Sequence, residues 1–561
     1  MFGPKMSDFH IWMLLVWVLL WTLMLLTASH EVKPAKRPNF IIILADDIGW
    51  GDLDANQPER KSNNTPNLNL MAAQGLKMTD FHSPASTCSP SRAAILTGRY
   101  GLRNGVTHNF AVESVAGLPL SEVTFPQLLQ KEGYYTAMIG KWHLGHNGPY
   151  RPTKRGFDYY LGIPYSNDMG CTDKPGYNLP KCPPCESTGS HLMRSLHGGC
   201  YSKLALPLIE NSSIVEQPLD LWSLTDQYKS AALQIIHNAS ARGQPYLLYM
   251  ALAHMHVPLA PPPSAGAASE GVYTSSLKEM DSLVGTIRSA SDDTDKNNTL
   301  IWFTGDNGPW EQKCLYAGSV GSFTGKWQTN KGTGQMSLIL QLRDGGSFWM
   351  RISFVAFFCA SGGGSAKQTT WEGGHRVPAV AYWPGRIPAN TSSSALLSGM
   401  DIFPTLLSLA GVNPPADRRY DGMDATNVLL HQEHMGHEFL FHPNSGAAGQ
   451  FGDLQTVRAG KYKAFYITGG AEACGGTTGR PQLHDPPLIF DLERDTAEET
   501  PLQVQTPEYL AVAQRIARRR EELLWDIATD KSVSTADYRK EESAAPCCDR
   551  RQAVCRCNTL D

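Results

Sequence analysis

The sequence lacks the excess of basic residues that nucleic-acid binding needs. Its 49 Lys and Arg are set against 53 Asp and Glu, so the formal net charge is -4. Charged residues make up only 18% of the chain, and no low-complexity tract is long enough to indicate disorder. We therefore expect a globular protein with no nucleic-acid partner, in which any anionic ligand is met by cations gathered at one site.

The sequence also lacks an apolar run typical of a spanning helix. The nearly unbroken run Ile11–Leu26 follows Lys5 and is followed by Thr27–His30. This pattern predicts a signal peptide over residues 1–30, with a retained anchor as the alternative, and no stable membrane span. Passage through the secretory pathway is also indicated by five glycosylation sequons, which begin at Asn63, Asn211, Asn238, Asn297 and Asn390.

Cysteine is sparse, and its 12 copies suit an oxidising compartment. Zinc ligation is conceivable at Cys182 and Cys185 or in the cysteine-rich tail, but disulfides are the better interpretation in a secreted chain. If Cys88 is consumed chemically and Cys359 belongs to an atypical segment, ten cysteines remain for five bridges.

At 561 residues the chain is too long for one compact core, which predicts a larger domain over 37–415 and a smaller one over 416–561. Continuous apolar runs alternate with helix-like segments in the first part, which predicts an α/β fold: a large, mostly parallel sheet between helices. The expected strands are Asn39–Leu44, Tyr134–Ile139, Tyr246–Ala253, Thr299–Thr304 and Val377–Trp383; the expected helices are 65–75, 121–132, 224–240 and 275–289.

The second part has a different texture. Lys461–Thr468 and Leu488–Leu492 are strand-like, and Pro507–Thr529 is a charged helical stretch. We expect a smaller α+β domain with a short antiparallel sheet and a stapled, cysteine-rich tail.

Oxygen-bearing side chains follow two of the predicted strands. Asp46 and Asp47 end the first, and Asp306 and Asn307 end the fourth. Ligands bind at such strand ends in open α/β sheets, and hard oxygen donors suit Ca²⁺ or Mg²⁺. The alternative is that the first pair caps a helix and the second forms an ordinary turn.

A possible nucleophile and a set of cations occur at comparable positions. Cys88, Pro90 and Arg92 form a C-x-P-x-R string. Cations near a divalent metal suggest an anionic substrate whose charge the site neutralises. The candidates are Arg92, Lys141, His143, His256 and Lys367.

These residues carry a resemblance to the type I sulfatases. Cys88–Gly98 resembles the first signature of that family and Gly133–His143 the second. Three further motifs occur in the family's order and extend the resemblance from about Arg37 to the C-terminal cysteines: Ile43–Asp52, Phe303–Gly308 and Lys367–Gly374.

The resemblance implies an alkaline-phosphatase-like fold and a sulfuric ester hydrolase. Cys88 would be oxidised by a formylglycine-generating enzyme to Cα-formylglycine, whose gem-diol attacks sulfur. One Ca²⁺ would be held by Asp46, Asp47, Asp306, Asn307 and modified residue 88.

The same resemblance implies roles for the cations. Arg92 and Lys141 would support the formylglycine, and His256 and Lys367 would contact the sulfate and the leaving oxygen. His143 would take the proton from the second hydroxyl and expel sulfate, an elimination that a plain serine or cysteine ester could not undergo. His256 is preferred to His254, which is expected to be a neighbour of the site.

Likeness within the arylsulfatases implies the substrate and location. It is carried by His442–Gly449 and Tyr462–Gly470, and it implies a lysosomal exosulfatase acting on glucosamine 3-O-sulfate of heparan sulfate and on aryl sulfates. Secretion to the exterior and a homo-oligomer are left open.

One segment departs from the family pattern. Residues 332–364 hold short apolar runs interrupted by Arg343, Asp344 and Arg351. A gene-model artefact is favoured over a genuine loop, and the segment ends next to Lys367.

Two competing functions remain. One is a phosphatase or phosphodiesterase of the same superfamily, which is disfavoured by Cys88 at the nucleophile position, with Pro90 and Arg92, and by the expected lack of histidine metal ligands near Asp46. The other is an inactive glycan-binding ectodomain, which would need the cations but not the modified cysteine.

Overall fold

The computed structural model describes residues 12–19, 21, 36–172, 204–261, 271–330, 333–336, 356–359, 362–551 and 553–557. The chain divides into two units, Met1–Arg37 and Pro38–Asp561. In the first unit, residues 12–19 and 21 are helical. Among the described residues, no helix combines the length and apolar character that crossing a membrane requires. Most of the predicted signal peptide lies outside the described residues.

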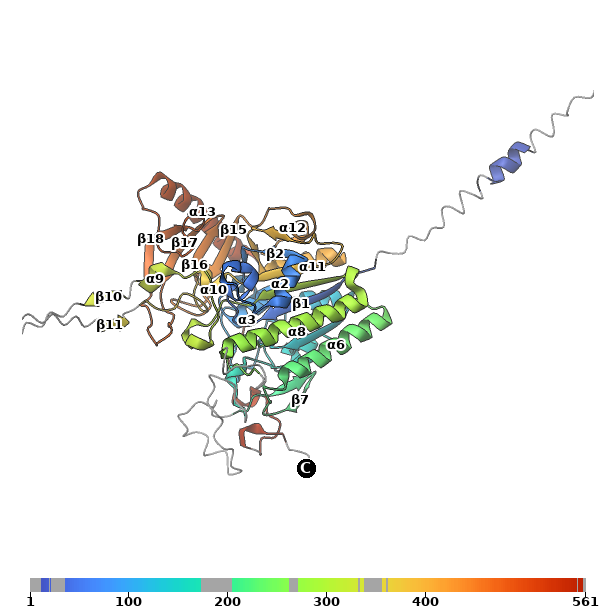
Figure 1. The fold of residues 1–561 in the computed structure, drawn as a ribbon, viewed down its shortest axis with the longest axis horizontal. Helices are drawn as coiled ribbons and strands as arrows, with labels where there is room; N and C mark the ends of the chain where they lie inside the picture. The colour runs from blue at the N-terminus through green and yellow to red at the C-terminus, as the bar shows by residue number, and fades with distance from the viewer. Residues whose placement is uncertain are drawn as a thin grey trace, which may run out of the picture. The chain divides into compact units, whose positions relative to one another are not determined.

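A ten-stranded sheet is the centre of the second unit (Figure 1), with the strand order β13-β2-β12-β9-β1-β8-β4-β5-β6-β7. The five strands from β9 to β5 are parallel to one another, whereas β12 and β6 run antiparallel to their inner neighbours. The bounds are β1 Asn39–Ala45, β2 Leu76–Met78, β4 Tyr135–Gly140, β5 Tyr159–Gly162, β6 Leu208–Glu210, β7 Ser213–Glu216, β8 Tyr246–Ala251, β9 Thr299–Gly305, β12 Ala379–Tyr382 and β13 Thr391–Ser393.

Helices cover both faces of this sheet. Alternate side chains of each buried strand point to opposite faces, so each strand contributes to both layers. In β1, Phe40 and Ile42 join the cluster that includes α3, α5, α11 and α12, whereas Ile41 and Ile43 join the cluster that includes α2, α6 and α8. Figure 1 shows α6 and α8 next to each other across one layer. The bounds are α2 Pro66–Ala73, α3 Cys88–Thr97, α5 Phe125–Lys131, α6 Leu224–Arg242, α8 Val272–Asp295, α11 Ile402–Ala410 and α12 Thr426–His431.

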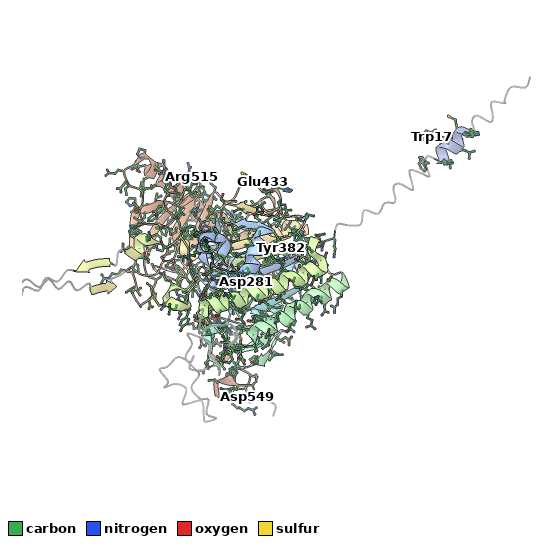
Figure 2. The ribbon with its side chains drawn as sticks, in the orientation of Figure 1. Trp17, Asp281, Tyr382, Glu433, Arg515 and Asp549 are labelled. Atoms are coloured by element: carbon green, nitrogen blue, oxygen red, sulfur yellow. A yellow bond between two sulfur atoms is a disulfide. The ribbon has the colours of Figure 1, made fainter. Side chains whose placement is uncertain are left out.

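Packing between helices also fixes where one of them begins. Asp281 of α8, labelled in Figure 2, accepts hydrogen bonds from the backbone N–H groups of Asn67 and Leu68, each at 2.9 Å. These N–H groups belong to the first turn of α2, where no carbonyl of the same helix can accept a hydrogen bond from them. A buried carboxylate at this positive helix end is also electrostatically favourable.

A second, antiparallel sheet has the order β15-β16-β17-β18 and packs against α13. Its elements are β15 Phe439–Pro443, β16 Leu454–Ala459, β17 Tyr462–Thr468, β18 Gln482–Asp491 and α13 Pro507–Thr529. The predicted fold class is therefore confirmed: a large, mostly parallel sheet between helices and a separate small antiparallel sheet. The domain boundary at residue 415 stays a prediction.

The described chain contains one disulfide between distant segments and two short-range disulfides in its tail. Cys314 is bonded to Cys474, and the tail holds the pairs Cys547–Cys555 and Cys548–Cys557. Cys171 is also disulfide-bonded, and Cys88 is free. Disulfides are therefore confirmed in the tail, while the predicted total of five bridges extends outside the described residues.

Most of the atypical segment 332–364 also lies outside the described residues. Within it, β10 (Thr333–Met336) pairs antiparallel with β11 (Ala356–Cys359). The choice between an artefact and a genuine loop stays a prediction.

Candidate active site

Polar side chains from two neighbouring strands meet at the carboxyl edge of the large sheet. Asp46 and Asp47 directly follow β1, and Asp306 and Asn307 directly follow β9, its parallel neighbour. Asn307 Nδ2 donates to Asp47 Oδ1 at 2.7 Å, and the Asp47 backbone N–H donates to Asp306 Oδ1 at 3.2 Å. All four side chains are buried. The predicted oxygen donors therefore do lie together.

Cys88 reaches this group from the first position of α3. Its Sγ lies 3.6 Å from Asp46 Oδ1 and 3.2 Å from Lys141 Nζ. The residue is only 1% exposed. A helix N-terminus carries partial positive charge, so this end of α3 favours an anion beside residue 88. Gly98 ends the helix with a φ of 67°, a left-handed conformation that glycine adopts at little cost.

Arg92 and Lys141 bind the carboxylates from the opposite side. Arg92 lies one turn into α3, and its Nε donates to Asp306 Oδ2 at 2.9 Å. Its NH1 donates to the carbonyl of Lys141 at 2.6 Å. Lys141, directly after β4, extends Nζ to within 2.6 Å of Asp46 Oδ2. The two cations thus connect α3 to the ends of three strands.

His256 and Lys367 both converge on Asp47. Lys367 Nζ lies 2.6 Å from Asp47 Oδ1, and His256 Nε2 lies 3.5 Å from Asp47 Oδ2. The expected lack of a histidine metal ligand near Asp46 stays a prediction, but His256 does lie beside these acids. The reason is topological: β8 pairs with β1, so the segment after β8 brings His256 to the same edge. His254 instead points to Thr225, with its Nε2 at 3.1 Å from the Thr225 hydroxyl.

The tautomer of His143 follows from its hydrogen bond. Its Nε2 lies 3.0 Å from the carbonyl of Phe110. A carbonyl only accepts, so Nε2 carries the hydrogen and Nδ1 keeps its lone pair. Nδ1 is buried without a hydrogen-bond partner among the described residues. His143 therefore has the tautomer of a base.

The electrostatics of the site are set by three buried carboxylates and their cations. Although burial opposes the charged form, Lys141 holds the pKa of Asp46 well below its usual range. Burial and the adjacent Asp46 raise the pKa of Asp306 to about 7. Burial also raises the pKa of the Cys88 thiol to about 12. An unmodified Cys88 would thus stay a neutral thiol, which is a poor nucleophile.

The donor set fits a divalent cation. The Asn307 Oδ1 atom is buried without a hydrogen-bond partner among the described residues, as expected for an oxygen that awaits a ligand. It belongs to a group with three carboxylates, one of which, Asp306, has a pKa raised first by burial and next by the charge of Asp46. Asp46, Asp47, Cys88 and His256 also place one potential ligand atom each within 4.8 Å of one another.

Two polar residues of the site were missing from the sequence prediction. Ser166 Oγ lies 3.1 Å from Lys141 Nζ and 3.3 Å from His256 Nε2. The nearby Asp168 has a lowered pKa, since His256 and Lys141 outweigh the effect of its burial. Both follow β5, a short strand that the sequence analysis did not identify.

An aromatic residue was also missed. The half-buried ring of Trp310 lies 5.3 Å from that of His256 and 4.5 Å from Lys367 Nζ. Its position three residues after Asn307 was the available signal.

Sequence comparison places most of the chain in two known families of domain. Residues 38–412 match the sulfatase family model, and residues 435–557 match the model for the C-terminal region of aryl-sulfatase. The chain is 56% identical to arylsulfatase G of Canis lupus familiaris over 94% of its own length and 92% of that protein. It is 34% identical to arylsulfatase A of Homo sapiens, with 95% and 98% covered.

Structural comparison gives the same result. The crystal structure of the PsFucS1 sulfatase from Pseudoalteromonas sp. superposes with a TM-score of 0.70 at 25% identity, covering 90% of this chain and 93% of that one.

Proposed function

The chain belongs to the sulfatase family, and from this premise we propose that it cleaves sulfate esters through a formylglycine made from Cys88, with Ca²⁺ bound at the adjacent acids. Sulfate-ester hydrolysis itself rests on the family match and on the near-full-length identity to arylsulfatases. The observation that carries the finer proposal is the position of Cys88 Sγ, 3.2 Å from Lys141 Nζ and beside Asp46.

Asp46, Asp47, Asp306, Asn307 and residue 88 would hold the metal. Oxygen donors that include an amide suit Ca²⁺, which tolerates mixed ligands and irregular geometry. When present, the modified residue 88 would supply a hydroxyl that can attack sulfur, and the metal would supply positive charge beside the sulfate oxygens.

The chain's own residues bind and orient the substrate. Lys367 and His256 both lie beside Asp47, where the sulfate and the leaving oxygen would lie, although burial lowers the pKa of His256. Lys367 stays charged because Asp47 raises its pKa against the effect of burial. His256 donates Nδ1–H to the Val257 carbonyl at 2.5 Å, which leaves Nε2 facing the site. Protonated at Nε2, His256 can supply a hydrogen to the departing oxygen.

Arg92 and Lys141 fix residue 88, and His143 accepts a proton. The lone pair of His143 Nδ1 would take the hydrogen of the second hydroxyl on residue 88, so that sulfate is expelled by elimination. This sequence of events needs no second water molecule at sulfur.

We further propose that the substrate is a sulfated glycan, specifically glucosamine 3-O-sulfate of heparan sulfate, together with small aryl sulfates. The support is the identity to proteins named arylsulfatase G. A lysosomal location reached through the secretory pathway is supported by the disulfides and by four sequon asparagines with exposed side chains, namely Asn63, Asn238, Asn297 and Asn390.

The test combines two measurements on the purified protein. Wild type should hydrolyse 4-nitrophenyl sulfate much faster than 4-nitrophenyl phosphate, and mass spectrometry of the peptide containing residue 88 should show an aldehyde. The Cys88→Ala variant should fold but lose at least ~10⁴-fold in kcat. Preference for the phosphate would favour a phosphatase, and full activity of Cys88→Ala would exclude the proposed mechanism.

A further inference from the structure

Trp310 lies against the residues that face the leaving group. Its ring is half-buried and contacts both His256 and Lys367, at 5.3 Å between ring centroids and 4.5 Å from Nζ. A molecule whose sulfate lies beside these residues must place the remainder of its ring close to Trp310. Indole rings bind the apolar faces of other rings and leave their polar substituents in water.

Lys313 adds a positive charge to the same ring. Its Nζ lies 4.2 Å from the Trp310 ring centroid. Lys141 and Lys367 are each neutralised by a carboxylate, Asp46 and Asp47 respectively. In the described part of the chain, by contrast, no carboxylate forms an ion pair with Lys313. Its ammonium group is therefore available to an anion of the ligand.

The short helix Glu311–Tyr316, which carries Lys313, is attached to the loop between β17 and β18 of the second sheet. Trp310 Nε1 donates to Gln312 Oε1 at 3.0 Å, and Gln312 Nε2 donates to Glu472 Oε2 at 2.6 Å. Cys314, two residues after Gln312, forms a disulfide with Cys474, two residues after Glu472. Trp310 and Lys313 thus stand on a braced segment rather than on a free loop, so they can select among ligands without first being ordered.

We propose that Trp310 and Lys313 form a subsite that binds a sulfated sugar by its ring face and by a second negative group. That group is a carboxylate or a further sulfate, on the reacting sugar or its immediate neighbour. This inference rests on the proposed function and adds a selectivity to it: the enzyme prefers dianionic glycans to matched monoanionic ones.

The test compares paired disaccharides that share one scissile sulfate. In one pair the second group is an N-sulfate or its N-acetyl counterpart; in the other it is a carboxylate or its methyl ester. Wild type should favour the dianionic member about fivefold in kcat/KM, through KM, as expected for one exposed ion pair. The preference should shrink as salt is added. The pair that shows the larger preference identifies the second group.

Five variants locate the effect. Lys313→Gln should remove the preference, and Lys313→Arg should retain it. Lys229→Gln, which removes an exposed lysine on α6, should leave it unchanged. Trp310→Ala should raise KM for every disaccharide, whereas Trp310→Phe should restore most of the affinity.

The outcomes separate this inference from the proposed function. Wild type without activity on aryl sulfates contradicts the proposed function. Activity on all substrates with no preference between pair members, or with the same preference in Lys313→Gln, overturns the subsite alone. A uniform loss in Lys313→Gln across aryl and sugar sulfates also overturns it, because that pattern indicates a structural role.

Discussion

Lys141 is the residue that couples the nucleophile position to the carboxylates. Its ammonium group contacts Asp46 Oδ2, Cys88 Sγ and Ser166 Oγ, at 2.6, 3.2 and 3.1 Å. Lysine has three N–H donors, and all three are used. Burial disfavours the charge on Lys141, but Asp46 raises its pKa, so the group stays cationic. The site therefore has a fixed positive charge next to residue 88 at any working pH.

On the proposed mechanism, the pH dependence of the reaction follows from His143. Burial, and next the charge of Lys141, hold its pKa well below the usual 6.5. A base works in its neutral form, which persists above its pKa, so lowering the pKa extends activity to more acidic solutions. We predict that the acid limb of kcat has its midpoint clearly below pH 6.5. The measurement is kcat from pH 4 to 8 with an aryl sulfate as substrate. The sulfate ester does not titrate in this range, so the profile reports on the enzyme.

A limb with its midpoint at or above pH 6.5 would contradict the role of His143 as the base. Wild-type stability should be recorded over the same range as the control, so that unfolding in acid is not taken for titration.

Single residues could be predicted where they belong to a motif or directly follow a predicted strand. Asp46 and Asp306 follow long apolar runs, and Lys141 and His256 follow two more. Ser166 could not be found in this way, because β5 has only four residues and no distinct pattern. Trp310 was missed because its position three residues after Asn307 does not by itself say whether a tryptophan in a loop faces a site or the core.

At the scale of elements, buried parallel strands were the easiest to predict. The runs at β1 and β9 are apolar at nearly every position, since helices cover both faces of the sheet. α3 was not predicted as a helix. All ten of its residues are buried, so it shows no alternation of polar and apolar faces, and Pro90 in its first turn resembles a loop signal. Its neighbours, rather than its own periodicity, determine it.

The ends of β1 and β9 should be held together by the metal. Three buried carboxylates repel one another, and a bound cation removes that repulsion, so it stabilises the folded state by RT ln(1 + [L]/Kd). We predict that a chelator lowers both activity and Tm and that Ca²⁺ restores both. At 100-fold excess over Kd the stabilisation is about 2.7 kcal/mol.

Asn307→Ala serves as the matched variant, because it removes one neutral oxygen donor and keeps the three acids. It should need more Ca²⁺ for the same rise in Tm. If the Tm of the wild type changed with neither chelator nor Ca²⁺, these side chains would not form a metal site.

The Cys314–Cys474 bridge joins the Trp310 segment to the second sheet's region across 160 residues. On the chain-entropy model a loop of this length contributes up to about 5 kcal/mol. We predict that the double change Cys314→Ser, Cys474→Ser lowers Tm by a few degrees and raises KM for glycan sulfates several-fold, since Trp310 loses its support. Thermal melts and steady-state kinetics measure the two effects.

The bridge Cys547–Cys555 is the control, since it closes a span of only 8 residues. Its removal should lower Tm less and leave KM unchanged. Equal effects on KM from the two bridges would argue against a link between the first bridge and substrate binding.

At the scale of the whole molecule, a buried ionic network joins the two sheets. Glu372, next to the large sheet, pairs with Lys463 of β17 at 2.8 Å and with Arg458 of β16 at 3.2 Å. Lys463 also faces Glu498 at 3.5 Å. Such a network is costly to break, because removing one partner leaves an uncompensated charge in a dry interior. The sequence could not reveal it, since its members are far apart along the chain.

This network makes stability depend on pH. Burial, together with the adjacent Glu372, raises the pKa of Glu498 to about 7. An acid whose folded-state pKa is raised contributes stability below its unfolded pKa of about 4.5, and this contribution is lost as pH rises to about 7. We predict that Glu498→Gln gains stability relative to wild type between pH 5 and 7.5, on the order of 2 kcal/mol or roughly 2 °C in Tm.

Melting curves of both proteins at the two pH values provide the measurement. The difference in Tm between variant and wild type should grow with pH. A difference that stays constant would mean that Glu498 does not titrate in this range.

The burial of Cys88 also has a consequence for biosynthesis. Any enzyme that oxidises this residue needs an accessible strand of chain, yet in the finished molecule the C-x-P-x-R string is wound into a fully covered helix. On the proposed mechanism, the modification would therefore have to take place before this part of the chain folds. A chain that folds first would keep an unreactive thiol, so the amount of active enzyme would depend on how slowly this part of the protein folds as well as on how much of it is made.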